Sequence, residues 1–456
     1  MIHNSLFISN FKKIMKRALP VAIVIALLVL GCRVLNYLYV EIVDTNEWTR
    51  ILWHNFYDEE ENIDNLYLGS SHVYCSLNPT QMDDLTGKNN FNLSSPAQRL
   101  NGSYYLLKEA GREHDLEHVY VELYYDVSTG REGDFKVEGL GANWFNSDYM
   151  KNSLNRFEFL LTMSDKKNYL ESLMPFIRYR SKLFDTEYVQ QQIDKKSGID
   201  YQNYQHTQQN EKGFVQYMDK GYYYSTLELS TEDLLLKQTK VLGDENPVSQ
   251  DAEKYLRKIM EYCKENEIEL TLFSAPVYEL QVLTTENYDT YIKYIRAIAD
   301  EYGVEYYDFN LSREEYLPIQ HTEYFGDKEH LNSAGAEMFT KFFWQVMQGT
   351  AEENEKYFYP SYSDKRQETE GYVYGILEVA PLEGSEGLRQ FKVASNWSEN
   401  IEYQIYTTPE DGDTVMLQDF SENPYFTVTP EETGVCRIEA RKTGEETPFQ
   451  TIDIKY

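Results

Sequence analysis

The sequence predicts a mixed α/β protein, in which a parallel-sheet domain of three α/β/α layers stands between an N-terminal transmembrane helix and a C-terminal β-sandwich. Three patterns predict it: an apolar run close to the N-terminus, alternating strand and helix patterns over residues 61–349, and a series of short alternating strands over 372–456. The 456 residues exceed what one hydrophobic core normally holds. We therefore expect at least two folded domains in addition to the anchor.

The N-terminal segment has the features of a membrane anchor. Residues 18–40 are almost wholly apolar, and at about 1.5 Å per residue a helix of this length crosses a bilayer. Four cations precede it: Lys12, Lys13, Lys16 and Arg17. They predict a cytoplasmic tail at 1–17 and an exported remainder. Alternatively, the sequence before Cys32 resembles a lipoprotein cleavage box, which would leave the chain anchored at Cys32 on the outer face. Apolar character that continues to Val40 favours the uncleaved anchor.

After a short tether or first helix at 41–60, strands and helices alternate. The predicted strands are Ile63–Leu68, Asn90–Leu93, His118–Tyr125, Glu269–Ser274 and Val304–Phe309. The predicted helices are Leu100–Ala110, Asp251–Asn266, Asn287–Tyr302 and Ala334–Met347. Such alternation predicts a parallel sheet with crossover helices. Ligands of these sheets lie outside the carboxyl ends of the strands, where Ser71, Ala97 and Asp126 fall. We expect Asp126 to cap the turn that follows it.

Three further segments complete the predicted organisation. Residues of about 130–245 interrupt the sheet pattern with patchy helical periodicity and predict an inserted helical cap. Residues 350–371 have little hydrophobic content and predict a linker. Residues 372–456 contain about seven short alternating stretches separated by turn residues, which is typical of an Ig-like β-sandwich.

Composition excludes several functions. With 43 Lys and Arg against 75 Asp and Glu, the net charge is -32, which disfavours nucleic-acid binding. The four cysteines are scattered without CxxC spacing, and His114 and His118 lack the arrangement of a zinc protease helix. We expect neither a metal nor a cofactor. The 40 tyrosines suit sugar stacking and half-buried strands equally well.

Two short motifs predict nucleophilic chemistry. Ser71 follows a buried strand on a turn of small residues, which suits an exposed nucleophile whose backbone N–H contributes to an oxyanion hole. Asp327 and His330 lie three residues apart just before the last helix of the domain. A turn of that length places a carboxylate against one imidazole nitrogen while the other faces the serine. His72, beside the nucleophile, is expected to pack rather than to react.

The order and placement of LGSSH and DKEHLNSAG resemble the SGNH, or GDSL-type, hydrolase superfamily over roughly residues 61–348. The resemblance implies that Ser71 is the nucleophile, Asp327 the orienting acid and His330 the general base. Asn92 to Ala97 resembles the second family block, with Ala97 where the family has an oxyanion-hole glycine. Tyr125 stands where the family has its oxyanion asparagine, so the tyrosine hydroxyl or Gln98 is expected to substitute.

An anchor followed by an exported SGNH-like domain is similar to membrane-anchored proteins that acylate envelope polymers, including the D-alanylation protein of lipoteichoic acid synthesis and alginate-type acetyltransferases. This similarity implies an acylated envelope polysaccharide, peptidoglycan or teichoic acid as substrate, and a membrane-bound acyltransferase as a further partner. Hydrolysis and acyl transfer both stay open. A second hypothesis is a non-catalytic protein that binds or scaffolds envelope polymers, suggested by Ala97 and Tyr125 in place of the family's oxyanion residues.

Overall fold

A computed structural model describes residues 2–42, 44–125, 140–210, 213–242, 247–369, 371–381, 387–396 and 399–456. Asp126 lies outside these residues. The chain divides into two compact units. We call Met1–Ile51 with Trp144–His206 the helical unit, and Leu52–Asn143 with Thr207–Tyr456 the main unit. The grouping of 144–206 with the N-terminal segment is not apparent from the sequence.

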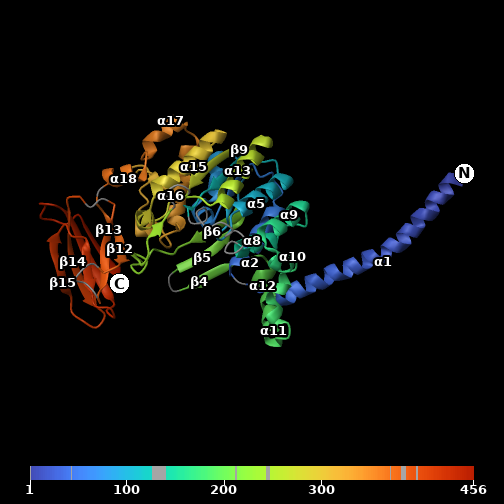
Figure 1. The fold of residues 1–456 in the computed structure, drawn as a ribbon, viewed down its shortest axis with the longest axis horizontal. Coiled ribbons are helices and arrows are strands. Elements are labelled where there is room, and N and C mark those ends of the chain that lie inside the picture. Colours follow the sequence, from blue (N-terminus) through green and yellow to red (C-terminus); the bar gives the residue numbers. More distant parts are fainter. Residues whose placement is uncertain are drawn as a thin grey trace. The chain divides into compact units, whose positions relative to one another are not determined.

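The main unit is built on a five-stranded parallel sheet (Figure 1). Its strands are β1 (Asn65–Leu68), β2 (Asn90–Asn92), β3 (His118–Glu122), β9 (Glu269–Ser274) and β11 (Glu305–Asp308). The spatial order is β2-β1-β3-β9-β11, so the direction of strand addition reverses between β1 and β3. A ligand of such a sheet lies at this reversal, outside the carboxyl ends. The predicted mixed α/β fold with a parallel sheet is confirmed.

Helices cover both faces of this sheet. They are α2 (Asp44–Asp58), α3 (Ser71–Ser76), α4 (Pro79–Thr86), α5 (Leu100–Glu113), α13 (Gln250–Glu265), α14 (Glu279–Leu283), α15 (Tyr288–Tyr302) and α16 (Ser333–Met347). The connections from β1 to β2 and from β2 to β3 run in opposite directions along the sheet, so right-handed crossovers place their helices on opposite faces. Accordingly, α3 and α4 pack against α16, whereas α5 packs against α13.

The predicted helical insertion is helical only in its first part. The described helices there are α8 (Leu140–Ser147), α9 (Leu154–Met163), α10 (Tyr169–Leu173), α11 (Thr186–Ser197) and α12 (Ile199–Gln202). The rest forms strands: β4 (Thr207–Asn210), β5 (Gly213–Met218), β6 (Tyr222–Ser225), β7 (Leu235–Leu236) and β8 (Lys240–Val241). β4, β5 and β6 make an antiparallel sheet of their own, and β8 pairs with β10 (Thr285–Glu286). Such short strands depend on their partners, and their Tyr- and Gln-rich sequences carry little periodic signal.

The C-terminal strands fit a sandwich, as predicted. They are β12 (Val373–Val379), β13 (Arg389–Ser395), β14 (Ile401–Pro409), β15 (Val415–Ser421), β16 (Tyr425–Val428), β17 (Gly434–Lys442) and β18 (Gln450–Lys455). One sheet has the order β15-β14-β17-β18 and the other β16-β13-β12-β7. The second sheet thus includes β7, which pairs in parallel with β12. One hydrophobic cluster extends from Tyr67 under the parallel sheet to Ile454 in the sandwich.

The tract expected to be a linker is instead folded. It contains α17 (Ala351–Asn354) and α18 (Tyr362–Glu368). The Lys365 ammonium is buried and lies 2.6 Å from the Glu279 carboxylate of α14, while the Tyr362 hydroxyl donates to the same carboxylate at 2.8 Å. A count of hydrophobic residues missed this packing because a tyrosine and a paired lysine supply the buried surface.

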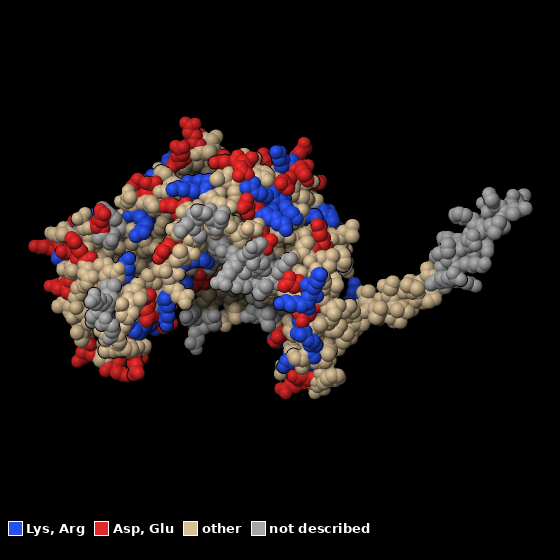
Figure 2. Space-filling model, viewed as in Figure 1, with Lys and Arg blue, Asp and Glu red and all other residues tan. Residues whose placement is uncertain are grey.

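In the helical unit, α1 (Ile2–Tyr39) contains the only segment among the described residues that is long and apolar enough to cross a membrane. That segment is Ala18–Tyr39, 22 residues with no part buried. Figure 2 shows it as a nearly uncharged rod. This agrees with the predicted anchor at 18–40 in position and length.

Candidate active site

Ser71 is held in place by strand β1 and by a glycine whose surroundings leave no room for a side chain. All four residues of β1 are buried, and the chain then turns at Gly69, whose φ is +158°. A Cβ at this position would lie 2.5 Å from Val73 Cγ2 and 2.7 Å from Glu122 Cβ, so only glycine fits. Ser70 then caps α3 by accepting a hydrogen bond from the backbone N–H of His72. Ser71 is therefore the first residue of a helix at the carboxyl end of a central strand.

A tight turn before α16 brings Asp327 and His330 together. Asp327 Oδ1 accepts hydrogen bonds from the backbone N–H groups of Glu329 and His330, at 2.8 and 2.9 Å. The His330 Nδ1 atom lies 2.9 Å from Asp327 Oδ2. At the end of the turn, Asn332 caps α16 by accepting from the N–H groups of Ala334 and Gly335. The turn is thus fixed at both ends.

The two motifs meet across 259 positions of sequence. His330 Nε2 lies 2.7 Å from Ser71 Oγ. Because a carboxylate only accepts, His330 Nδ1 carries the proton toward Asp327, and Nε2 accepts from the serine hydroxyl. The three residues predicted to form a catalytic triad are therefore joined by hydrogen bonds in the expected order.

Neighbouring charges and burial shift the pKa values of Asp327 and His330. Burial opposes ionisation of Asp327, but the hydrogen bond and charge of His330 prevail and lower the pKa of the carboxyl group to about 2. Burial lowers the pKa of His330, but the hydrogen bond and charge of Asp327, together with the charge of Glu329, outweigh burial and raise that pKa above its ordinary value. Asp327 is thus ionised at neutral pH and holds the imidazole in one tautomer.

Sequence reasoning did not find Glu122. This residue ends β3 fully inside the protein, and its Oε2 accepts from the Ser70 backbone N–H at 3.3 Å and from the Ser70 hydroxyl at 3.2 Å. Burial raises its pKa to about 8, against the lowering effect of the Ser70 hydrogen bonds. The carboxyl group is therefore neutral at pH 7 and supports Ser70, the residue before Ser71. A glutamate within the apolar run HVYVELYY was the available signal.

His72 and Tyr124 lie beside His330. The His72 ring stacks on Tyr124 with 3.7 Å between ring centroids and lies 5.0 Å from the His330 ring. Burial, and then the charge of His330, lower the pKa of His72 well below its ordinary value. His72 is a buried, neutral packing residue, in agreement with the sequence-based expectation.

The oxyanion candidates divide into two kinds. The Tyr125 hydroxyl accepts a hydrogen bond from Thr285 at 3.4 Å, and the Gln98 amide bonds to Ser95 and Ser103 at 2.8 and 3.1 Å. Both side chains are buried, and neither of these contacts involves the triad. Ala97, in contrast, is exposed with φ of +51°. Within the described residues, its backbone N–H has no hydrogen-bond partner.

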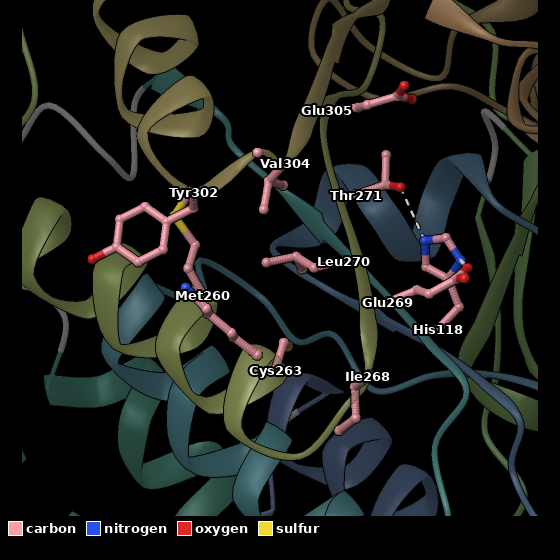
Figure 3. Close-up of a pocket in the computed structure, with 12 residues that line it drawn as sticks. His118, Met260, Cys263, Ile268, Glu269, Leu270, Thr271, Tyr302, Val304 and Glu305 are labelled. Carbon is pink, nitrogen blue, oxygen red and sulfur yellow. Dashed lines mark hydrogen bonds and ion pairs between the residues drawn. The ribbon is translucent and has the colours of Figure 1, made fainter.

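A cavity of about 440 Å³ lies elsewhere, at the amino ends of the strands (Figure 3). His118, Glu269 and Glu305 line it, and each is the first residue of its strand. His118 Nε2 lies 2.9 Å from Thr271 Oγ1, the contact drawn in Figure 3. Since all five strands are parallel, this cavity lies at the amino ends of the strands, whereas Ser71 lies at their carboxyl ends. Among the residues the structure describes, no cluster of His, Cys, Asp and Glu is arranged to hold a metal ion.

Comparison with known protein families and curated proteins finds no match to this chain. No protein-family model matches the chain, and no curated protein matches it. The chemistry of the site is therefore argued from the contacts of Ser71, Asp327 and His330 themselves.

Proposed function

We propose that this chain is a serine esterase or O-acyltransferase of the SGNH type. The observation that carries the proposal is the continuous hydrogen-bonded path from Asp327 through His330 to Ser71, with distances of 2.9 and 2.7 Å. The position of Ser71 after β1, at the reversal in strand order, supports the family resemblance. A buried polar turn without catalysis would not require a serine hydroxyl within hydrogen-bond reach of an oriented imidazole.

The geometry supports a two-step acyl transfer. Ser71 Oγ attacks the ester carbonyl carbon as its proton passes to His330 Nε2, and Asp327 stabilises the resulting imidazolium. The tetrahedral intermediate collapses when His330 returns that proton to the departing alkoxide, leaving an acyl-serine. In the second step His330 takes a proton from water or from an acceptor hydroxyl as its oxygen attacks the acyl-serine carbonyl carbon. His330 then returns this proton to Ser71 Oγ as the bond between the acyl carbon and Oγ breaks, which regenerates the serine.

Backbone donors stabilise the developing oxyanion in this proposal. The N–H of Ser71 and the exposed N–H of Ala97 are the two candidates, since the side chains of Gln98 and Tyr125 are engaged with other partners. Loss of one such donor in other enzymes costs roughly 10²–10³ in rate. Each of the two N–H groups is therefore expected to contribute measurably to the rate.

The proposed substrate is an acylated polysaccharide or teichoic acid of the cell envelope. We place the N-terminus in the cytoplasm, α1 across the membrane and the main unit outside. Apolar character that continues past Cys32 to Tyr39 favours an uncleaved anchor over a lipoprotein anchored at Cys32. In the transferase form of the proposal, a membrane-bound acyltransferase supplies the acyl group. The sandwich then serves as a sugar-binding module or a spacer.

A fluorophosphonate probe tests the nucleophile. The full-length protein in detergent should be labelled, and Ser71→Ala should abolish the label. Ser76→Ala is the matched control because Ser76 lies on the same helix, where its hydroxyl donates only to the Val73 carbonyl oxygen. An unlabelled wild-type protein, or equal labelling of Ser71→Ala, would refute the proposal.

A second experiment separates the remaining functions. With an acetyl ester as donor, acetylated polysaccharide in the presence of an acceptor indicates transfer, whereas free acetate alone indicates hydrolysis. Polymer binding that survives Ser71→Ala, with no cleavage of any ester, would instead identify the non-catalytic scaffold suggested by Ala97 and Tyr125.

A further inference from the structure

The helices of the helical unit are fixed to the carboxyl-terminal end of α1. The Tyr39 hydroxyl donates to the Leu183 carbonyl oxygen, and the Tyr188 hydroxyl donates to the Tyr39 carbonyl oxygen, both at 2.9 Å. The buried Lys196 ammonium donates to the carbonyl oxygens of Tyr37 and Val40 at 2.6 Å each. Lys196 thereby satisfies carbonyl groups that the end of a helix leaves open. These contacts hold the helices beside the last turn of α1.

These helices expose large apolar side chains to an unusual degree. Leu154 is 88 % exposed, Phe184 97 % and Ile199 74 %. On α9, Leu154, Phe157 and Leu161 are all exposed and share one face by their spacing, while Phe159 and Leu160 are buried. Further exposed members of the set are Leu170, Leu173 and Met174. We call these eight exposed residues the apolar surface. A water-facing surface rarely carries so many.

The charge of the helical unit differs from that of the rest of the chain. Outside the predicted cytoplasmic tail and membrane span, at 41–51 and 144–206, the helical unit has 10 Lys and Arg against 11 Asp and Glu and is nearly neutral. The main unit has 28 Lys and Arg against 64 Asp and Glu, so it carries more than the entire net charge of -32. Figure 2 shows acidic side chains gathered over the C-terminal strands and α17. An anionic lipid surface would therefore repel the main unit but not the nearly neutral helical unit.

The helical unit also contains several tyrosines, two of them on the last turn of α1. Near the end of α1, the Arg50 guanidinium stacks 3.7 Å from the Tyr201 ring and 4.2 Å from the Tyr204 ring. Tyr37 and Tyr39 lie on the last turn of α1. Tyrosine is enriched at the boundary between the hydrocarbon and water, where its ring and hydroxyl are both accommodated.

We propose that the apolar surface of α9 to α12 inserts into the outer interface of the bilayer that α1 crosses. The occupant is lipid, whose acyl chains contact the apolar surface. Continuity with α1 is the main argument, since contacts within the unit place these helices where a 22-residue span ends. This inference rests on the proposed membrane anchor and is independent of the chemistry of Ser71.

Fluorescence quenching tests the insertion in purified full-length protein, in vesicles of phosphatidylcholine and phosphatidylglycerol. Leu154→Cys and Phe184→Cys are labelled with a fluorophore in a Cys32→Ser background, where the remaining cysteines are buried. Val415→Cys is the matched control, because Val415 is an apolar residue of the main unit and 53 % exposed. A label on native Cys32 reports on α1 itself.

Labels at 154 and 184 should be quenched several-fold more by nitroxide lipids than the label at 415, and several-fold less by iodide. If nitroxide lipids quench the label at Cys32 but iodide quenches the labels at 154 and 184, the insertion of the apolar surface is refuted while the membrane anchor stands. That result would point to a partner protein absent from the vesicles. Iodide quenching at Cys32 would overturn the anchor as well. Protection that disappears on dilution with lipid would identify a second copy of the chain as the occupant and would refute the proposal.

Discussion

At the scale of single residues, the Asp327 carboxylate decides at which pH the site can react. It raises the pKa of His330 above 6.5, the ordinary value of the group. The imidazole must be neutral to accept the serine proton. Activity should therefore fall as pH decreases through a value above 6.5, and recover fully on returning to higher pH.

Substituting the aspartate separates its two roles. In Asp327→Asn the pKa of His330 falls, so the acid limb of the kcat/KM profile should move to lower pH. The plateau should decrease by roughly 10³–10⁴ because an amide does not enforce the tautomer. Glu329→Gln is the control, since Glu329 raises the same pKa by charge alone. It should move the limb while retaining most of the plateau. A profile of Asp327→Asn that matches the wild type would refute this role.

Glu122 makes a prediction about stability. Its pKa is about 8 in the folded protein and near 4.5 when exposed. The folded state thus keeps a proton that the unfolded chain releases, so the stability contributed by Glu122 is fully present below pH 4.5 and is lost as pH rises to about 8. Glu122→Gln should therefore melt like the wild type near pH 4. At pH 8 it should be more stable than the wild type by on the order of a few kcal/mol, which a higher melting temperature would show. Equal differences in melting temperature at both values would contradict a raised pKa.

At the scale of elements, the turn from β1 to α3 fixes Ser71, the proposed nucleophile. Gly69→Ala would drive a Cβ into Val73 and Glu122. We expect a loss of about 1–3 kcal/mol in stability and loss of probe labelling at Ser71. Gly87→Ala is the control, because Gly87 also has positive φ, at +67°, but no atom lies within 4 Å of the added Cβ. It should cost stability while Ser71 stays reactive, as measured by denaturant titration and labelling.

Elements with a local signal could be predicted from the sequence. β9 occupies the predicted residues Glu269–Ser274, and α16 begins one residue before its predicted start, because apolar periodicity and an Asn332 cap are encoded locally. The triad was predictable because a short turn already constrains Asp327 and His330. β7 was not, since a strand of two residues exists only through its pairing with β12.

At the scale of the whole molecule, the main unit should unfold as one body. The shared hydrophobic cluster and the β7–β12 pair join the parallel sheet to the sandwich, and the buried Lys365–Glu279 pair fixes α18 between them. Calorimetry of the full-length protein should therefore show one transition for both parts. Two separate transitions would show that the sandwich folds independently.

One substitution tests that coupling. Lys365→Met leaves the Glu279 carboxylate buried without its cation and should cost about 3–5 kcal/mol. Lys341→Met removes an exposed pair with Glu337 and should cost less than about 1 kcal/mol. The midpoints of urea unfolding measure both. Equal shifts would mean that the buried pair does not hold the two parts together.

The pairing of β7 with β12 also sets an order of events during synthesis. A ribosome delivers the chain from its N-terminus, so Leu235 and Leu236 emerge well before Ile376 and Leu377, the residues against which they pair. Ser71 and His330 are farther apart in the sequence, by 259 positions, so Ser71 also emerges long before its histidine partner. The nascent chain therefore has no histidine partner for Ser71 until residue 330 is made, and β7 stays unpaired until Ile376 and Leu377 are made. The main unit can complete its folding only in the last quarter of synthesis.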